Sequence, residues 1–262
     1  MELSYFPGDR HHFQMKILAI DTSTRSGGVA ILEGDSLVSS VFEGRDSVQE
    51  MPPPHPSDEF SSKLFRYVAS VLEKARIALP EVDLFAVTSG PGSFTGLRVG
   101  LAAVKGWSEV YGRPIAAISG LEAIAAQAKA TTGRIVPFTD ARRGQVYGAV
   151  FERQSGGLRS ISAEVGARPE DFLDSIVKIN SDIQMASEIP IAFVSPAPEI
   201  LREIIAGSSL RDSTVEKVSE DLAPWVGRLA FGKAQRGELV DALTLDANYV
   251  RRMDVEMYWK DS

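Results

Sequence analysis

Two short segments place a carboxylate beside other polar groups at the end of an apolar run. Asp21, Thr22 and Ser23 follow one such run, and Asp140 follows a second, Ile135–Phe138. A carboxylate beside hydroxyls, in a turn with exposed amides, can hold a Mg²⁺-bound phosphate. An ordinary Asx or Ser/Thr turn explains the first segment equally well from its spacing alone.

The segment from Ser89 to Gly100 is the most unusual in the chain. It is not a Walker A loop, and its spacing Gly90-x-Gly92-x-x-x-Gly96 is one residue too long for a dinucleotide fingerprint. Two explanations remain. A Gly-rich turn before a helix can bind an anion, or Gly96 and Gly100 share a helix face that another backbone approaches closely. Because glycine costs about 1 kcal/mol inside a helix, we favour close packing over phosphate binding.

Composition removes several classes of site and partner. The 262 residues include no cysteine and only three histidines, and their formal net charge is −7. Disulfides, thiolate catalysis and cysteine-bound zinc are therefore excluded, and no helical His-x-x-x-His pair can be written. An acidic chain is a poor candidate for binding a nucleic-acid backbone by itself, because that binding depends on Lys and Arg. Any metal would have to be a hard cation on carboxylates.

Apolar periodicity predicts two halves with the same order of elements. The first half has the order β-β-β-α-β-α-β-α, and the pattern restarts at Arg134, so that Asp140 mirrors Asp21. The repeat predicts two α/β lobes. We expect an N-terminal extension over residues 1–14, a first lobe over 15–133 and a second lobe over 134–262.

Hydrophobic runs and turn residues set the expected boundaries of these elements. Strands are expected at 16–20, 28–32, 37–42, 82–88, 114–118, 135–138, 145–151 and 191–194, and helices at 57–78, 96–111, 121–130, 170–177, 199–206 and 222–236. Ser155, Gly156 and Gly157 mark a hairpin or a loop insertion. The opening residues lack the apolar core of a signal peptide, and no run is long enough for a membrane helix. We therefore expect a soluble, cytoplasmic protein.

These segments, in this order, resemble the bacterial TsaB (YeaZ) family. The resemblance rests on Ile17–Thr24, Gly90–Gly100, Asp140–Tyr147 and Tyr249–Arg251, which together span nearly the whole chain. It implies the ASKHA fold, also called actin-like ATPase or RNase H-like, with two lobes of duplicated β-β-β-α-β-α units. It also implies a non-catalytic scaffold that pairs with TsaD and activates it. That complex forms N6-threonylcarbamoyladenosine (t6A) at position 37 of tRNAs that read ANN codons.

The resemblance further implies which surface binds the partners. This surface comes from the helix after the Pro-rich loop and the helix after the Gly-rich turn, and it comprises Phe60, Leu64, Gly92, Thr95, Gly96, Arg98, Val99, Gly100 and Ala103. TsaD is the main expected partner, and TsaE joins the assembly. A second copy of the chain would use the same surface. We expect tRNA to bind only through the complex, and we expect no binding to a membrane. A large residue at Gly96 or Gly100 is expected to abolish pairing while the isolated fold survives.

Two hypotheses about nucleotide chemistry stay open. In the scaffold hypothesis the chain has no catalytic residue, metal or cofactor, apart from weak ATP or ADP binding at Asp21, Thr22, Ser23 and Asp140 or at a shared interface. In the alternative the chain is an ATP-dependent small-molecule kinase, with Asp21 on Mg²⁺-ATP and Asp140 as a second metal or base carboxylate. Catalytic relatives hold a metal with a His-x-x-x-His pair, so the resemblance assigns the transfer chemistry to a partner.

Overall fold

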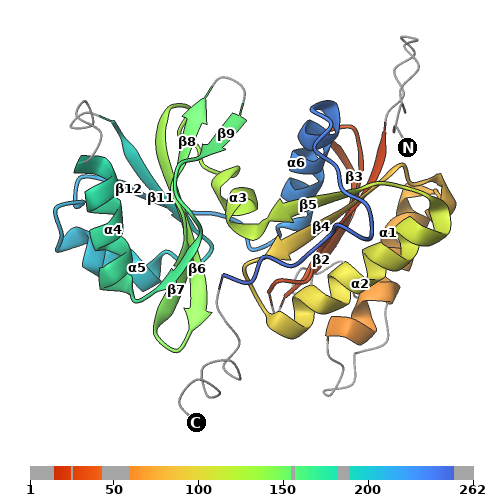
Figure 1. Cartoon of the computed structure of the whole chain (residues 1–262), viewed down its shortest axis with the longest axis horizontal. Helices are drawn as coiled ribbons and strands as arrows, with labels where there is room; N and C mark the ends of the chain where they lie inside the picture. The colour runs from red at the N-terminus through yellow and green to blue at the C-terminus, as the bar shows by residue number, and fades with distance from the viewer. Residues whose placement is uncertain (1–14, 25, 43–59, 155–156, 182–188, 251–262) are drawn as a thin grey trace.

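The computed structural model describes residues 15–24, 26–42, 60–154, 157–181 and 189–250, and its two halves lie side by side (Figure 1). The first half is built around one sheet. Its elements are β1 (Lys16–Asp21), β2 (Gly28–Glu33), β3 (Ser36–Phe42), α1 (Phe60–Ala75), the short 3₁₀-helix η2 (Leu79–Glu81), β4 (Leu84–Gly90), α2 (Phe94–Tyr111), β5 (Ile115–Ser119) and α3 (Gly120–Ala125).

Strand β1 lies at the centre of the first sheet because it is apolar on both faces. It pairs antiparallel with β2 and parallel with β4, which gives the strand order β3-β2-β1-β4-β5. Side chains alternate across a strand. Leu18 and Ile20 therefore face a core shared with α1 and α2. Ile17 and Ala19 face the opposite core, which they share with the last helix of the chain.

The second half repeats this arrangement. Its elements are β6 (Gly133–Arg142), β7 (Gln145–Gly148), β8 (Phe151–Gln154), β9 (Gly157–Ser160), β10 (Val165–Ala167), α4 (Pro169–Ser181), β11 (Ile191–Ser195), α5 (Glu199–Ala206), β12 (Thr214–Lys217) and α6 (Ala223–Gln235). Strand β6 pairs antiparallel with β7 and parallel with β11, and the strand order is β10-β7-β6-β11-β12. The connectivity and pairing match those of the first sheet, with the β8–β9 hairpin added. The predicted duplicated α/β fold is confirmed.

One apolar core joins the two halves. It contains Ile17 of β1, Ile124 of α3, Ile135 of β6 and Val226 of α6. Helix α6 packs against β1 and β2 although it follows the second sheet in sequence, and α3 packs against β6 (Figure 1). The last helix of each half thus contacts the other half's sheet. The expected boundary between residues 133 and 134 stays a prediction. No helix among the described residues is long and apolar enough to cross a membrane.

Several elements differ from the sequence-based expectation. Strands β10 and β12 were not expected, because both are short and largely exposed and so lack an apolar pattern. Helix α3 ends at Ala125 rather than near residue 130, and the Arg153 guanidinium donates hydrogen bonds to the carbonyls of Ala125 and Ala128 just past its end. The N-terminal extension, the Pro-rich loop and the expected start of the first helix at residue 57 lie outside the described residues.

Candidate functional site

The turn after β1 is built around a buried carboxylate. Asp21 is 0% exposed, and its Oδ1 accepts hydrogen bonds from the backbone N of Ser23 at 2.9 Å and from its Oγ at 2.6 Å. Its Oδ2 has no hydrogen-bond partner among the described residues. Burial raises the pKa of the Asp21 carboxyl, and the hydrogen bonds from Ser23 oppose this shift. Since Thr22 is also fully buried, neither side chain is presented to a ligand in this structure.

The glycines of the Gly-rich segment let this turn approach α2 closely. A Cβ at Gly92 or Gly96 would lie less than 3.0 Å from the backbone oxygen of Ser23 or Thr22, and one at Gly100 would collide with the Thr22 hydroxyl. The preference for close packing is therefore supported. The expectation that the isolated fold survives a large residue at Gly96 or Gly100 is wrong, because the approaching backbone belongs to the chain itself.

The start of α2 is held by its own chain. Ser93 caps the helix, since its Oγ accepts from the N–H of Gly96 and its carbonyl accepts from the N–H of Leu97. The N–H of Ser93 in turn donates to the carbonyl of Ser23 at 2.8 Å. These bonds occupy N–H groups that an anion at a helix N-terminus would use.

The segment that follows α6 crosses the same region. The N–H of Asn248 donates to the carbonyl of Ser89 at 2.7 Å. Gly90 has φ +135°, and a Cβ there would collide with the carbonyl oxygen of Asn248. Gly90 is therefore needed for its backbone conformation and for this contact. Tyr249, the next residue, packs against Phe94 at the start of α2 with ring centroids 5.1 Å apart.

The end of β6 places Asp140 in a different environment. Asp140 is exposed, and its Oδ1 accepts from the N–H of Arg142 at 2.7 Å across a β-bulge. Arg142 and Arg143 have φ values of 65° and 54°, a left-handed conformation that non-glycine residues rarely adopt. Asp140 thus stabilises a tight, solvent-facing turn.

A cleft of about 400 Å³ lies between the two turns. Its lining includes Ser23, Gly92 and Ser93 from the first half and Asp140 and Arg142 from the second. The structure therefore brings Ser23 and Asp140 to one cleft but buries Asp21 and Thr22 away from solvent. Nucleotide binding in this cleft stays a prediction.

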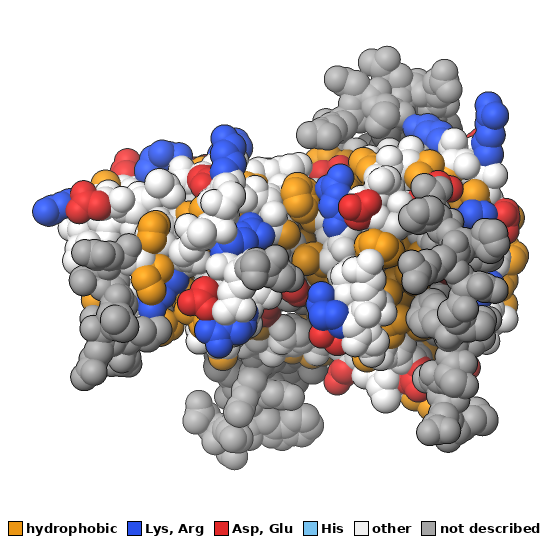
Figure 2. Space-filling model, turned by 90° about the horizontal axis from the view of Figure 1, so that it is seen from above, with side chains coloured by type: hydrophobic (Ala, Val, Ile, Leu, Met, Phe, Trp, Pro, Cys, Tyr) orange, Lys and Arg blue, Asp and Glu red, His pale blue; other side chains and the backbone are white. Residues whose placement is uncertain are grey.

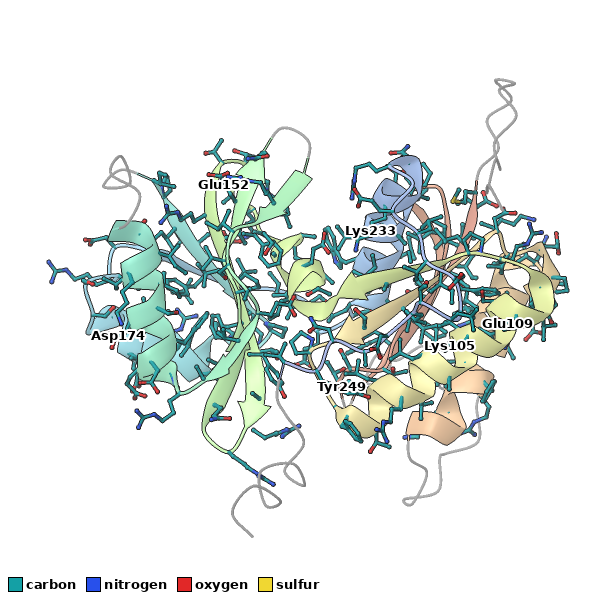
Figure 3. All side chains as sticks on the ribbon, viewed as in Figure 1. Lys105, Glu109, Glu152, Asp174, Lys233 and Tyr249 are labelled. Carbon is teal, nitrogen blue, oxygen red and sulfur yellow. The ribbon has the colours of Figure 1, made fainter. Side chains whose placement is uncertain are left out.

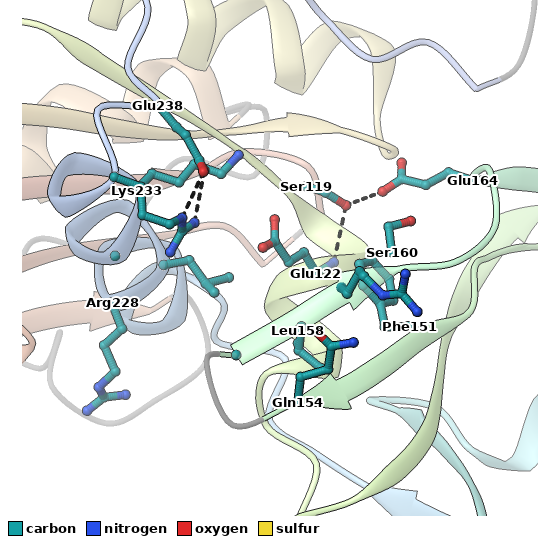
Figure 4. Close-up of a pocket in the computed structure, with 15 residues that line it drawn as sticks. Ser119, Glu122, Phe151, Gln154, Leu158, Ser160, Glu164, Arg228, Lys233 and Glu238 are labelled. Atoms are coloured by element: carbon teal, nitrogen blue, oxygen red, sulfur yellow. Dashed lines mark hydrogen bonds and ion pairs between the residues drawn. The ribbon is translucent and has the colours of Figure 1, made fainter. Parts of the chain in front are cut away.

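A second hollow of about 580 Å³ lies between α6, the start of α3 and the β8–β9 hairpin (Figure 4). Glu164 lies in its wall, where it accepts hydrogen bonds from Ser119 Oγ and, at 2.6 Å, from Asn248 Nδ2. Burial raises the pKa of Glu164 and of nearby Glu122. Glu164 therefore links the second half to the first half and to the segment that follows α6. Sequence reasoning missed this network, because its members are far apart in the chain and belong to no motif.

Charges of both signs are mixed on the upper face of the molecule. Seen from above, basic and acidic side chains lie interspersed, without a large patch of one sign (Figure 2). Among the described residues, no group of three or more His, Cys, Asp or Glu side chains could hold a metal ion. The three histidines, at positions 11, 12 and 55, lie outside the described residues.

The outer face of α2 is apolar and, within the described part of the structure, exposed at Gly106 and Val110 and partly exposed at Val99 and Ala103. We use this name for Val99, Ala103, Gly106 and Val110, whose spacing of four, three and four residues places them on one side of the helix. Val110 is 73% exposed, and a Cβ at Gly106 would meet nothing within 4 Å. On α1, Phe65 is 58% exposed and packs edge-on against Trp107 of α2. Exposed apolar residues therefore occur on both of these packed helices.

The structure separates the residues expected on the partner surface. Thr95 and Arg98 are exposed, and Val99 and Ala103 are partly exposed. Leu64 is wrong as a contact residue, because it is 0% exposed and belongs to the core beneath α1. Phe60 begins α1, but its side chain lies outside the described residues.

Sequence reasoning missed three exposed residues: Phe65, Gly106 and Val110. The spacing from Val99 to Val110 was available as a signal. The glycines nearer the start of the helix carry the stronger signal for close approach, and they lie on another side of the helix. The role of the exposed residues in partner binding stays a prediction.

Comparison with known proteins gives consistent matches. The family model described as TsaD, tRNA N6-adenosine threonylcarbamoyltransferase, matches residues 46–228. The tRNA threonylcarbamoyladenosine biosynthesis protein TsaB of Bacillus subtilis is 28% identical over 252 residues, which cover 95% of this chain and 99% of that protein. TsaB of Escherichia coli is 32% identical over 146 residues, 55% of this chain and 58% of its own length. The structure of YeaZ from Pseudomonas aeruginosa aligns with a TM-score of 0.68 and 25% identity over 89% of this chain and 99% of that one.

Proposed function

The chain belongs to the TsaD family, tRNA N6-adenosine threonylcarbamoyltransferase, and we propose that within it the chain acts as a TsaB-type subunit of t6A biosynthesis. In this role it pairs with a TsaD-type catalytic subunit and activates it, without catalytic residues of its own. TsaE joins the assembly, and tRNA binds through the complex. A second copy of the chain competes for the same surface. The similarity to TsaB along nearly the whole chain supports this assignment.

The observation that carries the proposal is the outer face of α2. Two features make it suitable for a partner helix: exposed apolar side chains, and a glycine whose missing side chain no part of the described structure explains. Monomeric proteins rarely expose contiguous apolar surface without a binding role. A stable pairing here would bury about 1,600 Å² in total, to which exposed residues of both α1 and α2 would contribute.

The kinase alternative lacks such support. It requires Asp21 to face Mg²⁺-ATP, and this carboxylate is fully buried beneath the turn that α2 covers. Burial also raises its pKa, which favours the neutral form over the charged form that a magnesium ion needs. ATP turnover by the purified chain alone would reverse this preference.

The proposal is tested by mixing the chain with the TsaD-type subunit of the same organism and measuring the mass of the complex by light scattering. Gly106→Leu places a bulky side chain on the outer face of α2, where nothing in the described structure obstructs it. Ala206→Leu adds the same group to the exposed end of α5 and serves as the control.

We expect the wild type and Ala206→Leu to form the complex and to support threonylcarbamoyl transfer. We expect Gly106→Leu to melt at or slightly above the melting temperature of the wild type, because leucine suits a helix better than glycine, but to lose complex formation. If Gly106→Leu pairs as well as the control, the outer face of α2 is not the binding surface. If the wild type does not pair at all, the TsaB-type role is wrong.

A further inference from the structure

Arg98 is an exposed arginine whose side chain is held in one orientation. Its guanidinium carbon lies 3.8 Å from the centroid of the Phe94 ring, one helical turn earlier. Its Nε donates a hydrogen bond to the hydroxyl of Tyr249 at 3.2 Å. Tyr249 packs in turn against Phe94, so the segment after α6 and the start of α2 hold the guanidinium from two sides.

This arrangement leaves the outer edge of the guanidinium free. Within the described part of the chain, the one polar contact of this side chain is the hydrogen bond from Nε. Its two terminal nitrogens have no hydrogen-bond or ion-pair partner there. A free arginine side chain must lose rotamer entropy to bind, whereas a side chain that is already held loses less. The paired terminal nitrogens match the two oxygens of a carboxylate.

The position of Arg98 connects it with the proposed partner surface. Arg98 directly precedes Val99, the first residue of the outer face of α2, and it lies on the flank of that face. Phe, Tyr and Arg are residue types enriched in protein interfaces, and Tyr and Arg dominate their binding hot spots. This cluster combines all three at the end of an apolar stripe.

We propose that Arg98 anchors the partner subunit through a carboxylate side chain, an Asp or Glu, that its terminal nitrogens bind as a pair. This inference rests on the proposed function and identifies the chemical group that the partner supplies. Phe94 and Tyr249 are positioning residues, because they fix the guanidinium and do not bind the carboxylate themselves.

A protein carboxylate fits this site better than a nucleic-acid phosphate. Lys105 and Glu109 follow Arg98 along the same flank of α2, so the flank carries charges of both signs (Figure 3). A phosphate backbone is bound by several cations in a row. A flank with one fixed arginine, one lysine two turns later and a glutamate one turn beyond it lacks such a row.

The test measures the dissociation constant for the TsaD-type subunit at low and at high salt. Arg98→Ala should weaken binding about 30-fold, the size of an interface hot spot. Arg98→Lys should recover less than half of this loss, because it restores the charge but not the paired geometry.

Tyr249→Phe keeps the ring and removes the hydroxyl, so it should weaken binding about threefold. Arg202→Ala, on the exposed side of α5, is the control and should have no effect.

The salt dependence separates an ion pair from a structural effect. Binding by the wild type should weaken as the salt concentration rises. The affinity of Arg98→Ala should depend less on salt, and its melting temperature should be unchanged.

Unchanged affinity of Arg98→Ala for the subunit would overturn the proposal, and so would full recovery of the affinity by Arg98→Lys. If Arg98→Ala reduces only tRNA binding, the bound group is a phosphate. If it reduces only self-association, the group belongs to a second copy. Either outcome also overturns the proposal.

The outcome for Gly106→Leu is independent of these results. If Gly106→Leu abolishes pairing while Arg98→Ala does not weaken it, the proposed function stands and the role of Arg98 is wrong. If neither variant affects pairing, the proposed partner surface itself is wrong.

Discussion

Asp21 and Asp140 lie at the ends of corresponding strands of a duplicated fold, yet their environments are opposite. Each is at or near the end of the central strand of a sheet with the same strand order. Asp21 is fully buried and accepts two hydrogen bonds from Ser23, whereas Asp140 is exposed and stabilises a solvent-facing turn. The end of the central strand is therefore part of the core in one half and part of the surface in the other.

The helix that follows the fourth strand of each sheet explains this difference. In the first half this helix is α2, with 18 residues and glycines where it meets the turn. In the second half it is α5, with 8 residues, no glycine and no side-chain cap at Pro198. Only the longer, glycine-bearing helix covers its turn. It also presents the outer apolar face, so one element serves both the core and the proposed interface.

The largest effect is expected from substituting glycines on the two sides of α2, which should change the free energy of unfolding in opposite directions. Gly96→Ala should lower the free energy of unfolding by about 3 kcal/mol or more, because the new Cβ overlaps the backbone of Thr22. Gly106→Ala should raise it by about 0.5–1 kcal/mol, because alanine suits a helix and the space is open. Urea denaturation of both variants measures the difference. If both variants changed the free energy of unfolding in the same direction, Gly96 and Gly106 would not lie on an inner and an outer side of α2.

The next largest effect is a pH dependence of the folding stability that Asp21 causes. Its folded-state pKa is raised above 3.8 by burial. The unfolded chain therefore releases this proton first as the pH rises, and the stability due to neutral Asp21 is lost from about pH 4 up to the raised pKa. The stability of the wild type relative to Asp21→Asn should fall over this range. A difference that stays constant with pH would show that Asp21 is charged in the folded chain.

The smallest effect is expected at the corresponding strand end of the second half. Asp140→Asn keeps an oxygen that can accept from the N–H of Arg142, and the side chain is exposed. It should change the free energy of unfolding by less than about 0.5 kcal/mol. A large loss of stability would mean that the two turns are more alike than their burial indicates.

Much of the fold was predictable from the sequence, because strong apolar periodicity marks its central elements. The boundaries of α5 were predicted as the structure has them, and those of β1 and β2 differ by one residue. Strands β10 and β12 could not be predicted, since backbone pairing with neighbouring strands defines them rather than apolar side chains.

The candidate site was only partly predictable. Spacing in the Gly-rich segment indicated that a backbone approaches closely, but spacing cannot say whether that backbone belongs to the same chain. The structure assigns Gly96 and Gly100 to the chain's own Thr22 and leaves Gly106 open. The network around Glu164 depends on residues brought together from distant segments, and no local pattern indicates it.

The most direct test of the central claim uses the absence of cysteine from the chain. Val110→Cys places a single thiol on the outer face of α2, and Ala206→Cys places one on α5 as the control. The rate of maleimide labelling is then measured with and without the TsaD-type subunit. The account predicts that the subunit protects the thiol at position 110 at least about tenfold and leaves the control unchanged. Equal labelling of both thiols in the complex would contradict it.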